Sequence, residues 1–277
     1  MSSRMFDPLL PSLLSSNMNF TLIAPDRRGF GHSHWSNPTT GPVTFDTFVN
    51  DLVSLIEHLA PGPFVFLAAS MGCGESVLAH SASAYIRENC KGFIWIGPNM
   101  PHGERCEENP DGVDPKVWDF LVAGLESSGR IGFIKEQVPG IFRTDLEGND
   151  IGREALGFYE GLVAMADPVA VVRTVGIMRR DMVKELEGLV AERVPVLMLH
   201  GDSDAGMPAG GSSMVVKRIL PEAQLKIYER GGHGELAIDE SLAGSGANED
   251  LGIYHTHAKK VAEDVLEFLR RVLDELK

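Results

Sequence analysis

A serine lies between small residues at the point where a predicted buried strand ends. Ser70 stands in the sequence A-A-S-M-G, directly after the apolar run at residues 63–69 and before a predicted helix. A sharp strand–serine–helix turn lifts the hydroxyl above the sheet and requires small residues two before and two after it, here Ala68 and Gly72. The turn also directs the helix N-terminus and the Met71 amide at the reacting centre, where they can stabilise an oxyanion. Because small residues around serine are common, this motif alone does not identify a nucleophile.

Two further strand ends carry residues that could serve a serine nucleophile. Asp202 and Asp204 follow the apolar run at residues 194–201, in H-G-D-S-D. A carboxylate at this place can orient an imidazole and stabilise its protonated form, although both aspartates could instead start a turn or cap a helix. His233 follows the alternating run at residues 224–229, in R-G-G-H-G. A histidine between glycines is more often a functional loop residue than a packed core residue.

The order and setting of these residues combine three weak signals into a stronger one. Serine, aspartate and histidine occur in this order, and each stands at the carboxyl end of its own strand. Ligands of open parallel sheets bind outside these carboxyl ends. The coincidence predicts a catalytic triad of Ser70, His233 and either Asp202 or Asp204. The eight other histidines fall on predicted loops, helices or a strand end, and we assign them no role.

The composition is that of a globular enzyme and excludes several other classes of protein. The 277 residues include 39 acidic and 25 basic side chains, with a formal net charge of −14. This charge repels phosphate backbones, so we expect no nucleic-acid binding through a broad basic face. No run approaches the ~18 apolar residues of a membrane span, and we expect no membrane association.

The cysteines and the first residues indicate a reducing, cytoplasmic location. The three cysteines are an odd number without the spacing of a metal site, which fits a reducing compartment. Residues 1–20 contain an arginine, an aspartate and two prolines but no apolar core of a signal peptide. We therefore expect a soluble, cytoplasmic protein, and leave its oligomeric state open.

Strands that alternate with helices predict an α/β fold with a mostly parallel sheet and flanking helices. Buried strands are predicted at residues 20–25, 63–69, 91–98 and 194–201, with a more exposed edge strand at 224–229. Helices are predicted at residues 45–59, 74–86 and 257–276.

The stretch between the third and fourth predicted buried strands has no good strand and predicts a helical cap. Helical patterns cover residues 115–125, 131–138, 153–166 and 168–186. We divide the chain into a core at 1–100 and 190–277 and a cap at 101–189, whose aromatic residues are individually more typical of core than of ligand contact. A Gly/Ser-rich stretch at 239–254 is interpreted as a solvated insertion, with an active-site lid as the alternative.

Several of these motifs together resemble the α/β-hydrolase superfamily, and within it the cofactor-free haloperoxidase/esterase group. The matching stretches are APDRRGFGHS at 24–33, ASMGCGES at 69–76, NPDGV at 109–113, VPVLMLHGDSD at 194–204 and ERGGHG at 229–234. The resemblance implies that Ser70 is the nucleophile and His233 the general base and then acid. It implies that Asp204 orients the histidine, because the acid of the family is the second aspartate of H-G-D-x-D. Serine disfavours the haloalkane dehalogenase and epoxide hydrolase branches, which carry aspartate there.

The chain departs from the family at its front. Members normally begin with three further strands, the third of which ends in a His-Gly loop that supplies a second oxyanion donor. Residues 1–14 resemble the first helix after that loop, and residues 20–25 the fourth strand of the family. Two interpretations follow: the sequence begins at an internal methionine of a longer, normal enzyme, which we favour, or the sheet is rearranged and catalysis impaired.

Three functions are consistent with this sequence. The first is a serine hydrolase without metal or organic cofactor that cleaves a small carboxylic ester or lactone through an acyl-enzyme. The resemblance adds a perhydrolase or haloperoxidase side reaction. The second is a biosynthetic relative that uses the same triad for lactonisation, cyclisation or C–C cleavage. The third is a non-catalytic binding protein, in which the lost oxyanion loop has ended catalysis.

Overall fold

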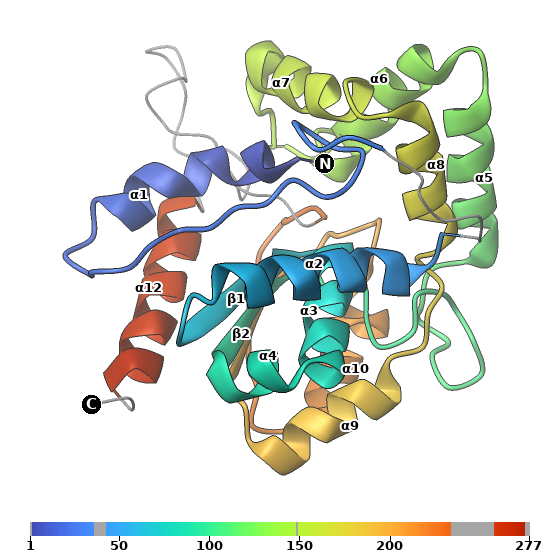
Figure 1. Ribbon diagram of the computed structural model, residues 1–277. Helices are drawn as coiled ribbons and strands as arrows, with labels where there is room; N and C mark the ends of the chain where they lie inside the picture. Colours follow the sequence, from blue (N-terminus) through green and yellow to red (C-terminus); the bar gives the residue numbers. More distant parts are fainter. Residues whose placement is uncertain (1, 36–42, 148, 234–257, 275–277) are drawn as a thin grey trace.

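The computed structural model describes residues 2–35, 43–147, 149–233 and 258–274 (Figure 1). The predicted Gly/Ser-rich loop at 239–254 lies outside these residues. The strands are β1 Phe64–Ala69, β2 Cys90–Ile96, β3 Val196–Gly201 and β4 Gln224–Tyr228. The helices are η1 Ser3–Leu9, α1 Leu10–Leu14, α2 Phe45–Leu59, α3 Met71–Ala82, α4 Ala84–Asn89, α5 Pro115–Glu126, α6 Arg130–Ile141, α7 Gly152–Ala164, α8 Pro168–Gly176, α9 Val183–Glu192, η2 Ala209–Gly211, α10 Ser213–Ile219 and α12 Ala258–Asp274.

The four described strands form one parallel sheet in the order β1-β2-β3-β4. The strands at residues 63–69, 91–98, 194–201 and 224–229 are therefore confirmed, with small differences at their ends. Because successive side chains of a strand point to opposite faces, each strand supplies both faces of the core. In β3, Leu197 and Leu199 belong to one buried cluster, whereas Val196 and Met198 belong to the other.

Helices cover both faces of this sheet, as the parallel topology requires. One buried cluster joins the sheet to η1, α1 and α12 and to the inner sides of α6, α7 and α8. The other joins it to α2, α3, α9 and α10. In Figure 1, α5, α6, α7 and α8 gather together above one end of the sheet, where the predicted cap belongs. The domain boundary at residue 101 stays a prediction.

The strand predicted at residues 20–25 is wrong. These residues are irregular and mostly exposed, and Leu22 and Ile23 present their side chains to solvent. A strand requires a partner for its backbone N–H and C=O groups. In the part of the chain that the structure describes, β1 is at the edge of the sheet and pairs only with β2. The β-branched and apolar composition of this segment is therefore not sufficient to make it a strand.

Two predicted helices are each divided into two helices in the structure. The helix predicted at 74–86 starts earlier, at Met71, and breaks at Ser83, whose hydroxyl accepts the N–H of Ile86 and starts α4. The helix predicted at 168–186 is likewise wrong as one element, because α8 ends at Gly176 and α9 begins only at Val183. Asp181 accepts the Val183 N–H at the start of α9.

The stretch APDRRGFGHS at residues 24–33 is bound to α3, the helix that follows Ser70, by an ion pair. Both nitrogens of the Arg27 fork lie 2.7 Å from the Glu75 carboxylate oxygens, so the pair is bidentate. The same guanidinium lies over the rings of Phe30 and Phe48. This segment is therefore held against α3 by the Arg27–Glu75 ion pair and against α2 by the contact of Arg27 with Phe48, rather than by strand pairing.

We predict that stability depends strongly on the β3 side chains beneath the helices. Leu197 is 0% exposed in the interior strand, so Leu197→Ala should lower the free energy of unfolding by roughly 2–5 kcal/mol through lost burial and a residual cavity. Leu14→Ala is the matched control, since Leu14 is 62% exposed and the change should cost under about 0.5 kcal/mol. Denaturant unfolding of both variants measures this, and equal effects would contradict the core described here.

Candidate active site

Ser70 occupies a strained turn between β1 and α3. Its φ of 51° and ψ of −122° lie in a backbone region that residues other than glycine rarely adopt. The turn is held by the Ser70 N–H, which donates to the Ile96 carbonyl of the neighbouring strand at 2.9 Å. A Cβ on Gly72 would lie 3.7 Å from that of Ala68. The two small residues thus face each other across the turn, as the sequence predicted.

Met71 is the first residue of α3, and its amide and side chain have different surroundings. The side chain is buried in the cluster between the sheet and α2. The N–H lies in the first turn of a helix, where no carbonyl four residues earlier is available to it. Of the two, only the amide remains a candidate for the oxyanion contact that the sequence analysis assigned to Met71.

Asp204 is fixed in the loop after β3 by donors to both carboxylate oxygens. Its side chain is 0% exposed. The Met207 N–H donates to Oδ1 at 2.6 Å, while Oδ2 accepts from His233 Nδ1 at 2.9 Å. Asp202, the other candidate acid, is exposed and accepts only the neighbouring Ser203 hydroxyl among the hydrogen bonds of the described residues. The structure therefore brings Asp204, not Asp202, to His233.

His233 lies in the loop after β4, and this loop rests on the one that carries Asp204. The Ser203 N–H donates to the Gly231 carbonyl at 2.9 Å. A side chain on Gly201 would collide with the backbone of Gly231, so glycine at the end of β3 permits this close approach. The His233 side chain remains 21% exposed, which leaves one side of the imidazole accessible.

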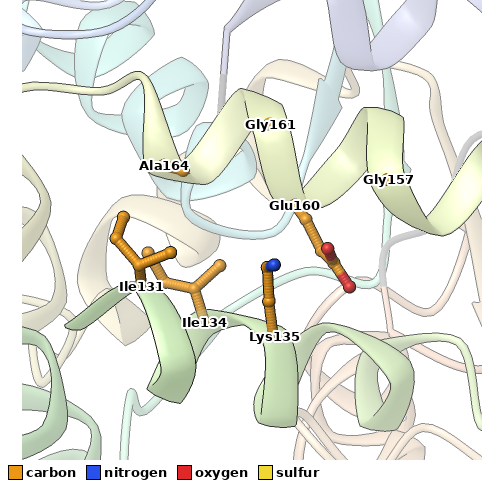
Figure 2. A pocket seen from close by; sticks show the side chains of 7 residues that line it. All are labelled: Ile131, Ile134, Lys135, Gly157, Glu160, Gly161 and Ala164. Atoms are coloured by element: carbon orange, nitrogen blue, oxygen red, sulfur yellow. The ribbon is translucent and has the colours of Figure 1, made fainter. Parts of the chain in front are cut away.

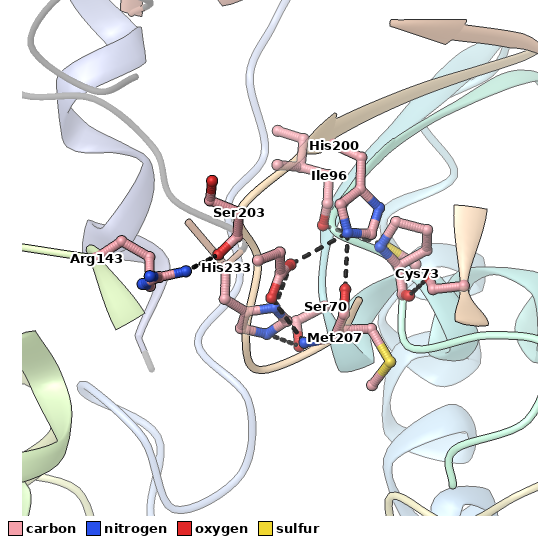
Figure 3. Close-up of polar contacts among 11 residues, drawn as sticks. Ser70, Cys73, Ile96, Arg143, His200, Ser203, Met207 and His233 are labelled. Atoms are coloured by element: carbon pink, nitrogen blue, oxygen red, sulfur yellow. Dashed lines mark hydrogen bonds and ion pairs between the residues drawn. The ribbon is translucent and has the colours of Figure 1, made fainter. Parts of the chain in front are cut away.

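The three predicted residues form a continuous line of contacts, and Figure 3 labels two of them, Ser70 and His233. Ser70 Oγ lies 2.9 Å from His233 Nε2, and His233 Nδ1 lies 2.9 Å from Asp204 Oδ2. Because the carboxylate can only accept, we assign the imidazole proton to Nδ1. Nε2 is then free to accept the hydroxyl proton of Ser70. This geometry can activate a serine hydroxyl for nucleophilic attack.

The charges and hydrogen bonds of the buried Asp204–His233 pair shift both pKa values against the effect of burial. Burial alone would raise the pKa of Asp204, but the positive charge of His233 and hydrogen bonds from two imidazoles hold it well below its usual range. Burial alone would lower the pKa of His233, but the Asp204 charge and hydrogen bond outweigh it and raise the pKa above 6.5. Each partner thus favours the charged form of the other.

His200 is a residue of the site that the sequence analysis missed. Its buried Nε2 lies 2.8 Å from the Met207 carbonyl oxygen and 3.2 Å from Asp204 Oδ2. Both neighbours are acceptors, so Nε2 carries a proton and donates to them. The available sequence signal was its position four residues before Asp204 in H-G-D-S-D. A histidine at the end of a buried strand is more often a core residue, and the contact with Asp204 depends on how the loop turns back.

Other chemistry is limited in the described part of the chain. Within residues 2–35, 43–147, 149–233 and 258–274, no three His, Cys, Asp or Glu side chains are grouped to hold a metal ion. None of the described helices alone has the length and hydropathy to cross a membrane, and α7 and α8 meet that test only as a pair bent by 90°.

A hollow of about 210 Å³ lies between α6 and α7 and contains no member of the predicted triad. Figure 2 shows Lys135 of α6 and Glu160 of α7 projecting into the same gap. Its lining residues are Ile131, Ile134, Lys135, Gly157, Glu160, Gly161 and Ala164. Because all of them belong to these two helices, the hollow is separate from the Ser70 site.

Comparison with known proteins identifies the class to which this fold and site belong. A family model described as the alpha/beta hydrolase fold matches residues 1–236. The chain therefore belongs to the α/β-hydrolase fold family. This confirms the predicted fold class and the prediction of an α/β-hydrolase enzyme.

The nearer relatives belong to the non-haem haloperoxidase and esterase group. Non-heme chloroperoxidase CPO-A1 from Kitasatospora aureofaciens is 30% identical over 252 residues, which cover 90% of this chain and 82% of that protein. Bifunctional esterase/perhydrolase DCH from Acinetobacter calcoaceticus is 24% identical and covers 91% and 82% of the two chains. The crystal structure of bromoperoxidase from Bacillus anthracis matches with a TM-score of 0.80 at 26% identity, over 98% of this chain and 88% of that chain. The predicted resemblance to this group is confirmed.

We predict that the two neighbouring aspartates differ sharply in their effect on His233. Asp204→Asn removes the buried charge that raises the pKa of His233, so that pKa should fall below its wild-type value. Asp202→Asn is the matched control in the same loop and should change it little, because an exposed charge is screened by solvent. NMR titration of the His233 imidazole measures both variants. Equal shifts would show that Asp204 is not its specific partner.

Proposed function

We propose that the chain is a serine hydrolase that cleaves a carboxylic ester or lactone through an acyl-enzyme on Ser70. The observation that carries this proposal is the unbroken line of contacts from Ser70 Oγ through His233 to the buried Asp204. Relatives whose names include esterase and perhydrolase support it. We further propose that residues 101–189 act as a cap over the substrate.

The proposed reaction has two steps that use the same histidine in opposite directions. His233 Nε2 accepts the Ser70 proton as Oγ attacks the carbonyl carbon, and the imidazolium is stabilised by Asp204. It then returns the proton to the leaving alcohol, which leaves an acyl ester on Oγ. Water, deprotonated by His233, attacks that ester and releases the acid. The Met71 N–H is proposed to donate to the oxyanion in both steps.

A perhydrolase side reaction follows from the same acyl-enzyme. Hydrogen peroxide that replaces water in the second step attacks the acyl carbon and releases a peracid, while Ser70 recovers its proton. The peracid can then oxidise halide in solution without a halide site on the protein. The chloroperoxidase and perhydrolase names of the relatives support this part of the proposal.

We predict that a fluorophosphonate labels Ser70 and that the label requires its hydroxyl. Intact-mass analysis should show one adduct on the wild-type chain and none on Ser70→Ala, which should also lose turnover of short-chain nitrophenyl esters by about 10⁴-fold or more. Ser81→Ala is the matched control, because Ser81 is exposed at the far end of the same helix and should leave labelling unchanged. A folded wild-type chain without an adduct would favour the non-catalytic alternative.

The pH dependence of ester turnover should report the ionisation of His233. Only the neutral imidazole accepts the Ser70 proton, so kcat/KM should fall as the pH drops through the raised pKa, with a midpoint above 6.5. In Asp204→Asn this midpoint should move to lower pH while kcat falls by roughly 10⁴-fold. An acid limb that stays in place in Asp204→Asn would assign the titration to another group.

A further inference from the structure

The segment that joins α6 to α7 contacts the loops of both Asp204 and His233. The Ile141 carbonyl, at the end of α6, accepts the backbone N–H of His233 at 3.0 Å. Two residues later, Arg143 Nη1 donates to the Ser203 carbonyl at 2.8 Å, as Figure 3 shows. Ser203 directly precedes Asp204. The segment after α6 is thus hydrogen-bonded both to the loop that carries Asp204, called the acid loop below, and to the loop that carries His233.

The Arg143 side chain is itself held in one direction. Its Nε and Nη2 each lie 2.9 Å from one carboxylate oxygen of Asp145, which makes a bidentate pair. The ion pair with Asp145 occupies Nε and Nη2 on one edge of the guanidinium, which leaves Nη1 to donate to the Ser203 carbonyl. Because the fork is planar and rigid, fixing one edge also fixes the direction of the third nitrogen. Asp145 therefore preorganises the contact that Arg143 makes with the acid loop.

The same segment holds the His233 loop at a second place. The buried Asn149 side chain donates to the Arg230 carbonyl at 2.9 Å. In return, the Arg230 side chain reaches the Glu147 carbonyl at 3.4 Å. The loop of His233 is thus hydrogen-bonded to this segment at two places. One is Arg230, just after β4, and the other is His233 itself.

This arrangement bears on the distance between Asp204 and His233. The two residues stand on loops of different strands, and their hydrogen bond weakens steeply as distance or angle departs from ideal. Because the segment between α6 and α7 is hydrogen-bonded to both loops, it limits how far one loop can move relative to the other. Displacements of about 1 Å at a catalytic group can cost on the order of 10²-fold in rate.

We propose that Arg143 is a positioning residue for the hydrolase site, which sets the separation of Asp204 and His233 by binding the Ser203 carbonyl while Ile141 binds the His233 amide. The part that concerns turnover rests on the proposed function. The part that concerns the Asp204–His233 contact does not, and it can be measured in the absence of any substrate.

The sharpest variant is the double substitution Arg143→Met with Asp145→Asn. It removes the fork and its partner together, so the net charge near the site is unchanged. Loss of Arg143 alone would raise the pKa of His233 through space, because a positive charge disappears and Asp145 is left unpaired. Loosening of the Asp204 contact acts in the opposite direction. In the double variant we expect the pKa of His233, measured by NMR titration, to fall, by less than in Asp204→Asn.

Arg105 offers a matched control. Its guanidinium also pairs with an aspartate, Asp114, and also donates to a backbone carbonyl, that of Gly112. Among the described residues it makes no hydrogen bond or ion pair with Ser203, Asp204 or His233. Arg105→Met should leave the His233 pKa unchanged. Asp145→Asn alone changes a side chain that is 62% exposed, and it replaces the double variant if that variant does not fold. Because it removes a negative charge and would lower the His233 pKa through space, its readout is kcat, which should fall below the wild-type value.

Turnover provides the second readout. The double variant should lower kcat for a nitrophenyl ester by about 10- to 100-fold with KM changed by less than about threefold, because positioning of the histidine acts on the chemical step. Fluorophosphonate labelling should slow in parallel but still reach Ser70. Arg143→Lys, which keeps a donor but not the fork, should recover only part of the rate.

The outcomes separate the two proposals. An unlabelled wild-type chain would overturn the proposed function, while a lowered His233 pKa in the same double variant would still establish the role of Arg143 in the Asp204 contact. A folded double variant with an unchanged or raised His233 pKa would overturn the positioning role. So would equal effects of the double variant and Arg105→Met.

Discussion

The carboxylate of Asp204 is the constraint around which the site is organised. A carboxylate that is withdrawn from water is tolerated only where hydrogen bonds and opposite charge replace its hydration. Here a backbone N–H and two imidazoles provide them. Each donor comes from a different place in the fold: the turn after β3, the end of β3 itself and the loop after β4. The hydrogen bonds to the Asp204 carboxylate therefore connect parts of the chain that would otherwise be independent loops.

Much of the site could be predicted because its residues follow strands in the sequence. Ser70 comes directly after a recognisable apolar run, and Asp204 and His233 follow such a run or an alternating run within a few residues. In a parallel sheet the carboxyl ends of the strands meet at one edge. Sequence alone left Asp202 and Asp204 equivalent, and only the resemblance to the family preferred Asp204. The structure adds the reason, since one aspartate is buried against His233 and the other is exposed.

What could not be predicted depends on contacts between distant segments. Arg143 carries no local signal of its role. His200 lies four residues before Asp204 in the sequence, but that spacing does not show whether the loop turns back to bring the two side chains together. The segment at 20–25 has the composition of a strand, but a strand also requires a pairing partner, and no described strand pairs with this segment. The break at Ser83 coincides with a side-chain hydrogen bond that starts α4. The gap between α8 and α9 contains a hydrogen bond from the Met182 N–H to the Pro101 carbonyl, which is a contact between distant segments.

The order of the strands has a consequence for how the site assembles. Ser70 follows β1 and His233 follows β4, which are the two outer strands of the described sheet, and their contact joins residues 163 positions apart in the chain. The entropy of closing so long a loop must be overcome by the pairing of all the strands between them. The Ser70–His233 hydrogen bond therefore depends on the pairing of all four described strands in register, across the whole width of the sheet.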